Sequence, residues 1–154
     1  DMWTTYAKTD REEQIIAAAE GILLRRLMRK GRISEPADTT HYLRNHLGTK
    51  DYEVFGAIFL DTRHNILAVD DLFQGTIDEA SVYPREVVKA ALKHNAAAVI
   101  FYHNHPSNDP SPSEADRRLT DVLVRALKLI DIRVLDHFVI AADRYEGFAS
   151  KGWI

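Results

Sequence analysis

Residues 96–116 read AAAVIFYHNHPSNDPSPSEAD, and this stretch decides which fold and which chemistry we expect of the chain. The apolar run 96–101 has the length and composition of a buried strand. His103 and His105 follow near its end at positions i and i+2. Because side chains alternate across a strand, both imidazoles should point to the same side. The two histidines can therefore share one ion.

The proline-rich segment 106–112 ends this strand and turns the chain back. Ser113 then opens a helical pattern that should bring Asp116 toward the histidines. The chain has no cysteine, so imidazole and carboxylate groups would have to hold any metal ion. Two histidines and one aspartate leave a fourth position for water, as in catalytic zinc sites. We therefore predict a Zn²⁺ site formed by His103, His105 and Asp116.

Both halves of this motif also have simpler interpretations. Ser113 with an acidic residue three positions later fits a helix capping box, a role that is compatible with metal binding. A single histidine near a strand end is usually a surface residue or a hydrogen-bonded core residue. Two histidines at this spacing, followed by a carboxylate, favour the metal site instead.

Composition limits the class of protein. The chain has 154 residues, of which 45% are hydrophobic, so we expect one main domain with a proper core. Its longest apolar stretch, 96–102, is far shorter than the roughly 20 residues of a membrane-spanning helix. No signal-peptide pattern opens the chain, and we expect a cytoplasmic protein without membrane association. The lack of cysteine excludes disulfides and the cysteine-containing zinc nucleobase deaminases.

The overall charge gives no attraction to nucleic acid, because the formal net charge is -3 at pH 7. One local exception is a basic cluster at the end of the first predicted helix. It consists of Arg25, Arg26, Arg29, Lys30 and Arg32. These side chains either complement the helix dipole in solvent or form a contact surface for DNA, RNA or an acidic partner.

Residues 1–48 are expected to form a helical lead. A capping box, Thr9 to Glu12, begins a long helix that should end at Gly31. Its predicted apolar face comprises Ile15, Ile16, Ala19, Ile22, Leu23 and Leu27. Asp38 or Thr39 is expected to cap a shorter second helix through Leu47.

Residues 49–154 carry the pattern of an α/β domain. We expect strands at 52–60, 66–69 and 96–101, a short strand at 73–77, and further strands at 132–141 and 145–149. Helices are expected to begin at Pro84 and Ser113. This order predicts a mixed β-sheet flanked by helices, on which the helical lead packs.

The motif His103-Asn-His105-Pro, with Asp116 ten residues further on and Ser113 three residues before it, resembles the JAMM motif of MPN-type metallohydrolases. Within that superfamily, residues 50–154 are similar to the bacterial RadC-like proteins, homologues of the DNA repair protein RadC. The strings that support this resemblance are Glu53-Val-Phe-Gly56, Phe59-Leu-Asp61, Leu72-Phe-Gln-Gly75-Thr-Ile-Asp78, Tyr83-Pro-Arg85-Glu86, His103-Asn-His-Pro-Ser107, Asp136-His137 and Gly152-Trp-Ile154.

The resemblance implies a three-layer JAMM/MPN fold of the cytidine-deaminase-like type, with Zn²⁺ bound by the two histidines and Asp116. It also implies that Glu53, on the first strand, hydrogen-bonds the zinc-bound water and acts as general base. Ser113 would donate a hydrogen bond to the oxyanion that develops on the substrate. Without the resemblance, Glu53 would be read as an ordinary surface residue.

Some features depart from the family pattern or allow two interpretations. Asn108 stands where the family commonly has glycine, a position that calls for a left-handed backbone. The lead also shows no paired glycine motif like the DNA-associated helix-hairpin-helix segment of longer RadC-like proteins. Asp136 and His137 are either hydrogen-bond partners of the metal ligands or a core pair. The remaining histidines, expected at the surface, are His41, His46, His64 and His94.

Three functional hypotheses follow from these residues. The first is a zinc-dependent hydrolase that cleaves a peptide or isopeptide bond in a peptide or protein substrate. The alternative is a DNA-associated RadC-like module, either a repair or recombination factor or a metal-dependent nuclease. The third, a catalytically silent scaffold, is disfavoured because all the ligand residues are present.

Overall fold

The computed structural model of the protein describes residues 10–29, 33, 36–78 and 80–154. Its helices are α1 (Asp10–Arg29), α2 (Pro36–Leu47), α3 (Pro84–Lys93) and α4 (Glu114–Lys128), followed by a 3-10 helix, η1 (Ala149–Lys151). Its strands are β1 (Val54–Leu60), β2 (Ile66–Gln74), β3 (Ala98–Asn104), β4 (Arg133–Ile140) and β5 (Tyr145–Gly147).

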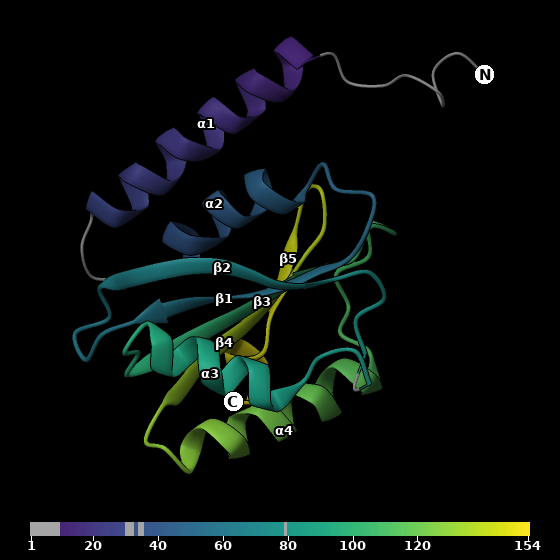
Figure 1. The fold of residues 1–154 in the computed structure, drawn as a ribbon. Helices are drawn as coiled ribbons and strands as arrows, with labels where there is room; N and C mark the ends of the chain where they lie inside the picture. The colour runs from purple at the N-terminus through teal and green to yellow at the C-terminus, as the bar shows by residue number, and fades with distance from the viewer. Residues whose placement is uncertain (1–9, 30–32, 34–35, 79) are drawn as a thin grey trace.

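The strands form one mixed sheet in the order β2-β1-β3-β4-β5 (Figure 1). β1 is antiparallel to both β2 and β3, and β5 is antiparallel to β4. β3 and β4 are parallel, and α4 makes the long crossover that a parallel pair requires. The predicted mixed α/β sheet is therefore confirmed.

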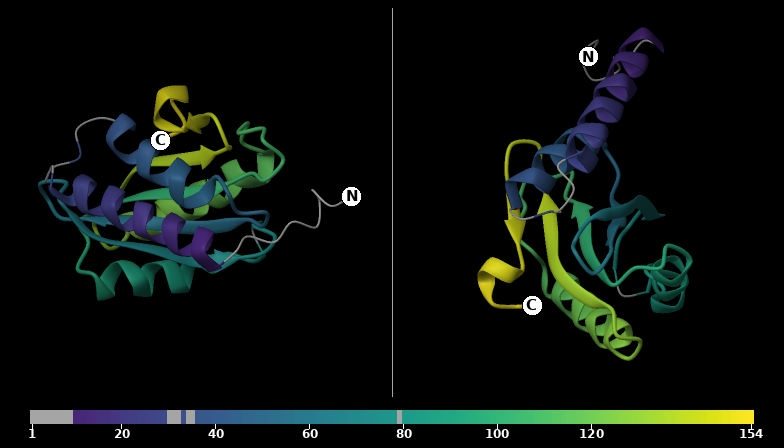
Figure 2. Two further views of the ribbon diagram at one scale, coloured as in Figure 1. Left: turned by 90° about the horizontal axis from the view of Figure 1, so that it is seen from above. Right: turned by 90° about the vertical axis from the view of Figure 1, so that its left-hand side faces the viewer.

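The sheet lies between two helical layers, with α1 and α2 on one face and α3 and α4 on the other (Figures 1 and 2). Side chains alternate across β1 and β3, so each strand contributes to two cores. The core under α3 and α4 includes Phe55, Phe59, Val99, Phe101, Leu119 and Leu123. The core under α2 includes Leu43, Leu47, Ile58, Leu60, Ile100 and Tyr102. Because both faces of β3 are covered, its sequence is a continuous apolar run rather than an alternating one.

Gly56 allows β1 and β3 to pack closely around a buried tyrosine. Gly56 pairs with Tyr102 across the two strands, and the Tyr102 hydroxyl donates a 2.6 Å hydrogen bond to Asp71 Oδ1 on β2. A Cβ atom at Gly56 would collide with the Tyr102 ring and lie 2.5 Å from the carbonyl oxygen of Asp70. A side chain is therefore excluded at position 56, which pairs with Tyr102, the residue before His103.

Two predicted element boundaries are wrong. α2 begins at Pro36, so positions 38 and 39 lie inside the helix rather than at its N-cap position. Proline suits the first turn of a helix because its missing N–H would have no partner there. β2 continues to Gln74, which pairs with Val54, so the separate short strand at 73–77 does not exist.

The helical lead packs on the sheet through α2, as predicted, and α1 lies outside α2. α1 buries only Leu27 completely, while Ile15 and Ile22 of its predicted apolar face are 58% and 43% exposed. Thr9 and Gly31, the predicted ends of this helix, lie outside the described residues. None of the described helices combines the length and the apolar content needed to cross a bilayer. The division between residues 48 and 49 stays a prediction.

Two histidines predicted at the surface instead make tertiary contacts. His94 Nε2 lies 2.5 Å from Asp70 Oδ2, and its ring packs on Phe59. His46 on α2 lies 3.3 Å from Glu20 on α1 through Nδ1 and 3.0 Å from Asp71 on β2 through Nε2. His46 therefore links the outer helix to the sheet.

We expect this link to make stability depend on pH. Burial by itself lowers the pKa of His46, but the hydrogen bonds and charges of Asp71 and Glu20 raise it by more, so the net pKa lies above its ordinary 6.5. Burial by itself raises the pKa of Asp71, but the hydrogen bonds from His46 and Tyr102 lower it by more. The His46 contribution is thus complete below pH 6.5 and disappears as the pH rises through the folded-state pKa. The Asp71 contribution is complete above pH 3.8 and disappears as the pH falls through the lower folded-state pKa of Asp71.

His46→Gln should therefore lower the free energy of unfolding by about 1 kcal/mol near pH 6 and by less near pH 8.5. Urea unfolding of both proteins at the two pH values measures this difference. The other histidines contribute equally to both proteins and cancel in the comparison. An equal loss at both pH values would contradict a charged His46.

Candidate metal centre

β3 and the turn after it position the two histidines. His103 is next to last in β3 and only 1% exposed, and it faces α4 together with Phe101 and Phe55. His105 follows the strand, and its backbone N–H donates to the carbonyl oxygen of Ile140 on β4. Register with β4 thus continues past the end of β3 and holds His105 beside His103.

The turn after His105 has the backbone predicted for it. Asn108 has φ of 68°, the left-handed region in which asparagine is tolerated better than most residues. The Asn108 N–H donates to the carbonyl oxygen of His105, and Asn108 Oδ1 accepts from the N–H of Ala142. The asparagine side chain therefore anchors a turn that a glycine could not anchor.

The first turn of α4 positions the carboxylate. Ser113 is the N-cap residue, and its Oγ accepts a 3.0 Å hydrogen bond from the Asp116 N–H. The Ser113 N–H donates in return to Asp116 Oδ2 at 2.8 Å. The capping box is thus present, and the carboxylate that completes it also faces the histidines.

His103, His105 and Asp116 converge on one point. The two Nε2 atoms are 3.0 Å apart, and they lie 3.3 Å and 3.2 Å from Asp116 Oδ1 and Oδ2, respectively. Ligands about 2.0–2.1 Å from a tetrahedral zinc ion are about 3.3–3.4 Å from one another. Among the residues that the structure describes, these three side chains form the one group of histidine and carboxylate ligands that could hold a metal ion.

The protonation of His105 fits a metal ligand. Its Nδ1 lies 2.9 Å from the carbonyl oxygen of Asp109, which can only accept a hydrogen bond. Nδ1 must therefore carry a proton, and in the neutral ring Nε2 is left with an unshared electron pair. This electron pair is directed at the same point as the Asp116 carboxylate, which is the arrangement that a cation requires.

Electrostatics at the centre also favour a cation. Burial alone would raise the pKa of Asp116, but the adjacent imidazoles of His103 and His105 and the Ser113 N–H lower it by more, so the carboxylate stays ionised. A proton on His105 Nε2 would be stabilised by a hydrogen bond to Asp116, which raises the pKa of His105 against the effect of burial, and the negative charge of Glu53 adds to the rise. Two carboxylates thus act on one small site.

Glu53 lies immediately before β1, not within it as predicted. Its backbone carbonyl accepts from Gly75, and its Oε2 accepts a 2.7 Å hydrogen bond from the Ile77 N–H. The half-buried carboxylate is therefore oriented by the segment after β2. Pairing of Phe55 with His103 places this end of β1 beside the histidines. The catalytic roles of Glu53 and Ser113 stay predictions.

Asp136 and His137 separate into different environments. Asp136 Oδ1 accepts from the backbone N–H groups of His137 and Ala149, so it stabilises the chain near η1. His137 is fully buried, and its Nε2 lies 2.7 Å from His103 Nδ1. Burial lowers the pKa of His137 well below its ordinary value, so the ring is neutral. The prediction that this pair contains a hydrogen-bond partner of a metal ligand therefore holds for His137 but not for Asp136.

A side chain that sequence reasoning missed also reaches this group. Thr120 lies one helical turn after Asp116, is buried, and has its Oγ1 2.6 Å from His137 Nδ1. In the sequence, Thr120 stands four residues after Asp116, which predicts that the two side chains lie on the same face of the helix.

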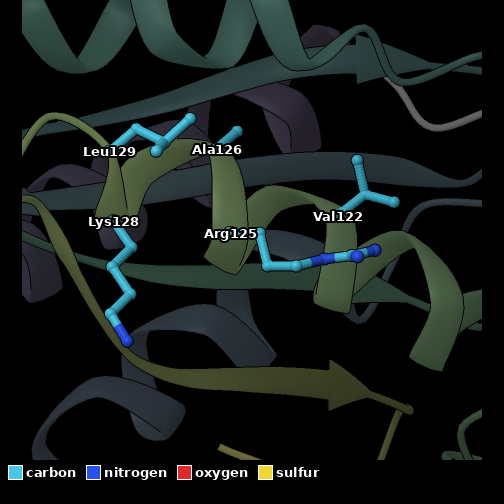
Figure 3. Close-up of a pocket in the computed structure, with 5 residues that line it drawn as sticks. All are labelled: Val122, Arg125, Ala126, Lys128 and Leu129. Atoms are coloured by element: carbon cyan, nitrogen blue, oxygen red, sulfur yellow. The ribbon is translucent and has the colours of Figure 1, made fainter.

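One cavity lies beside this centre, and another lies away from it. A small cavity of about 50 Å³ lies against His105 and is also lined by Lys50 and Asn108. A larger pocket of about 750 Å³ lies on the second half of α4, between Val122 and Leu129 (Figure 3). None of the three converging residues lines this larger pocket.

The basic cluster is only partly described. Arg25, Arg26 and Arg29 are exposed on the last turns of α1. Lys30 and Arg32 lie outside the described residues.

Comparison with known proteins agrees with the geometry. The family described as RadC-like JAB domain matches residues 33–153. Two UPF0758 proteins of Vibrio cholerae serotype O1 are similar to the chain: one is 48% identical over 97% of this chain and 96% of its own length, the other 50% identical over 93% and 90%. A UPF0758 protein of Xanthomonas campestris is 52% identical over 86% of this chain.

The chain spans only 59% of the length of that Xanthomonas protein, but almost all of the two from Vibrio. The family match covers the sheet, α2, α3 and α4, and with them every residue of the candidate centre. With relatives about 50% identical over most of its length, this protein belongs to the RadC-like JAB domain family.

Proposed function

We propose that the protein is a zinc-dependent hydrolase of the JAMM type that cleaves a peptide or isopeptide bond. The observation that carries this proposal is the convergence of two imidazole nitrogens and one carboxylate at the mutual distances of zinc ligands. Three protein ligands leave a coordination position open, which distinguishes catalytic from structural zinc sites. Zn²⁺ bound there would polarise a carbonyl and lower the pKa of a water molecule toward about 7.

Glu53 and Ser113 supply the remaining groups for such a reaction. Glu53 acts as general base, taking a proton from the attacking water and passing it to the leaving amine. The hydrogen bond from Ile77 orients its carboxylate for this role. Ser113 Oγ accepts from the Asp116 N–H, so its own proton is available to stabilise the negative charge on the attacked carbonyl oxygen.

Metal analysis and reconstitution test this proposal. The purified protein should contain one zinc ion per chain, and His103→Ala should lose it, whereas His41→Ala, at an exposed position on α2, should retain it. Cleavage of a quenched fluorescent peptide mixture or of a lysine-linked isopeptide should stop after chelation and return on addition of zinc. Activity that survives complete removal of metal would exclude the mechanism.

A second candidate function is a DNA-associated role, favoured by the exposed Arg25, Arg26 and Arg29 on one end of α1. It predicts DNA binding that weakens as the salt concentration rises. The double substitution Arg25→Glu and Arg26→Glu should weaken it further. Failure of the protein to be retained on duplex or single-stranded DNA at low salt would end this proposal.

A further inference from the structure

A line of buried hydrogen bonds runs from the metal centre into the protein behind His103. His103 Nδ1 lies 2.7 Å from His137 Nε2, and His137 Nδ1 lies 2.6 Å from Thr120 Oγ1. Thr120 Oγ1 in turn donates a 2.8 Å hydrogen bond to the backbone carbonyl of Asp116. The three side chains are at most 1% exposed, so water does not substitute for any of these partners.

The carbonyl at the end of this line determines the direction of every bond in it. A carbonyl oxygen only accepts, so the single hydroxyl proton of Thr120 is used there. Thr120 Oγ1 must then accept from His137 Nδ1, which therefore carries the proton of that ring. A neutral imidazole has one N–H, so His137 Nε2 accepts from His103 Nδ1. His103 Nδ1 thus carries a proton, so the neutral His103 ring has its unshared electron pair on Nε2, the nitrogen that faces the metal position.

The opposite direction is excluded by the same contacts. It would require Thr120 to donate to His137, which would leave two oxygen electron pairs facing each other at 2.8 Å between Thr120 and Asp116. His137 is enclosed by the rings of Phe55, Phe101 and Phe148, at centroid distances of 5.6, 6.1 and 4.6 Å. A buried imidazole among aromatic rings is not charged, so it cannot donate from both nitrogens.

We propose that Thr120 and His137 are positioning residues that fix the tautomer of His103, so that its Nε2 is ready to bind a metal ion before one arrives. Asp116 lies at both ends of this line of hydrogen bonds. Its carboxylate faces the metal position, and its backbone carbonyl accepts the hydrogen bond from Thr120. The Asp109 carbonyl does the same for His105 directly. Removing a hydrogen-bond partner that orients a ligating histidine typically lowers metal affinity 10- to 100-fold.

The tautomer can be measured directly in the metal-free protein. Long-range ¹H–¹⁵N correlation spectra of the histidine rings at pH 8 should show His103 protonated at Nδ1, and His137 protonated at Nδ1 and bare at Nε2. A bare Nδ1 on His103 would overturn the proposal. This readout needs neither an activity nor a variant.

Three variants test the consequence for binding. Thr120→Val, which removes the hydroxyl at nearly constant volume, should weaken zinc binding 10- to 100-fold in competition with a chelating dye. Thr120→Ser should restore affinity to within about 3-fold of the natural protein, because it restores the hydroxyl group. Thr39→Val is the matched control: Thr39 is equally buried, its Oγ1 has no hydrogen-bond partner among the described residues, and zinc affinity should not change.

The outcomes also separate this proposal from the proposed function on which it rests. Unchanged zinc affinity in a folded Thr120→Val protein would refute the role of the hydroxyl, whether or not the protein hydrolyses peptides. If Thr120→Val does not fold, the ring spectra of the natural protein still decide the tautomer. The expected tautomer and affinities without any hydrolysis would leave the positioning role intact and refute only the hydrolase.

Discussion

Glu53→Gln is expected to reduce turnover of the peptide or isopeptide probe by about 10²- to 10⁴-fold, because an amide cannot take a proton from water. The zinc content should not change, since Glu53 is not among the three converging ligand residues. The fold should also be retained, because the glutamine oxygen can still accept the hydrogen bond from the Ile77 N–H. Steady-state kinetics, together with metal analysis of the same sample, measures this result.

The control for this substitution is Glu86→Gln, at a half-buried glutamate on α3 outside the centre. It should leave both turnover and zinc content unchanged. Equal turnover in Glu53→Gln and the natural protein would exclude Glu53 as the general base. Loss of zinc from Glu53→Gln would instead place Glu53 among the ligands.

Gly56→Ala is expected to destabilise the protein by about 3 kcal/mol or more. The added methyl group would collide with the Tyr102 ring and approach the carbonyl oxygen of Asp70 to 2.5 Å. A flexible side chain could move aside, but the Asp70 carbonyl is part of the β1–β2 ladder and Tyr102 is tied to Asp71. Urea unfolding monitored by circular dichroism should show a lower midpoint.

Gly21→Ala is the matched control, because the same methyl group is added where there is room. At Gly21, on α1, the new Cβ would be 3.4 Å from the end of the flexible Arg25 side chain. Alanine has the higher helix propensity, so this variant should gain about 0.5–1 kcal/mol. Equal effects of the two substitutions would show that packing at Gly56 is not limiting.

The His46 and Thr120 variants test two other links between distant elements. His46 joins α1 to β2, whereas Thr120 joins α4 to β4 and β3. The first should change stability in a pH-dependent manner without changing zinc affinity. The Thr120→Val variant should instead lower zinc affinity. The two links can therefore be tested independently in the same protein.

Local sequence determined the ligand motif and the elements that carry it. His103 and His105 at i and i+2 share a side because strand side chains alternate, and the Ser113–Asp116 capping box turns a carboxylate toward them. Both effects act over a few residues, so they can be read without knowing the fold. The same holds for the apolar run of β3, which is buried on both faces.

Element boundaries depended on partners elsewhere in the chain. β2 extends to Gln74 because β1 offers backbone hydrogen bonds that far, although the local pattern suggested an earlier end. Ile15 and Ile22 on α1 remain exposed because α1 reaches the core between α2 and the sheet only through Leu23, Leu24 and Leu27. Apolar periodicity identifies a helix but does not say how much of its face another element will cover.

Only tertiary structure decided which groups support the ligands. Strand register and alternation direct His137 toward His103 and Asp136 away from it, and a shift by one residue would have exchanged the two. Thr120 meets His137 only because α4 packs on β4, and Glu53 reaches the centre only because β1 pairs with β3. Hydrogen bonds between residues 17 and 34 positions apart follow no local period, so their partners become defined only when the chain is packed.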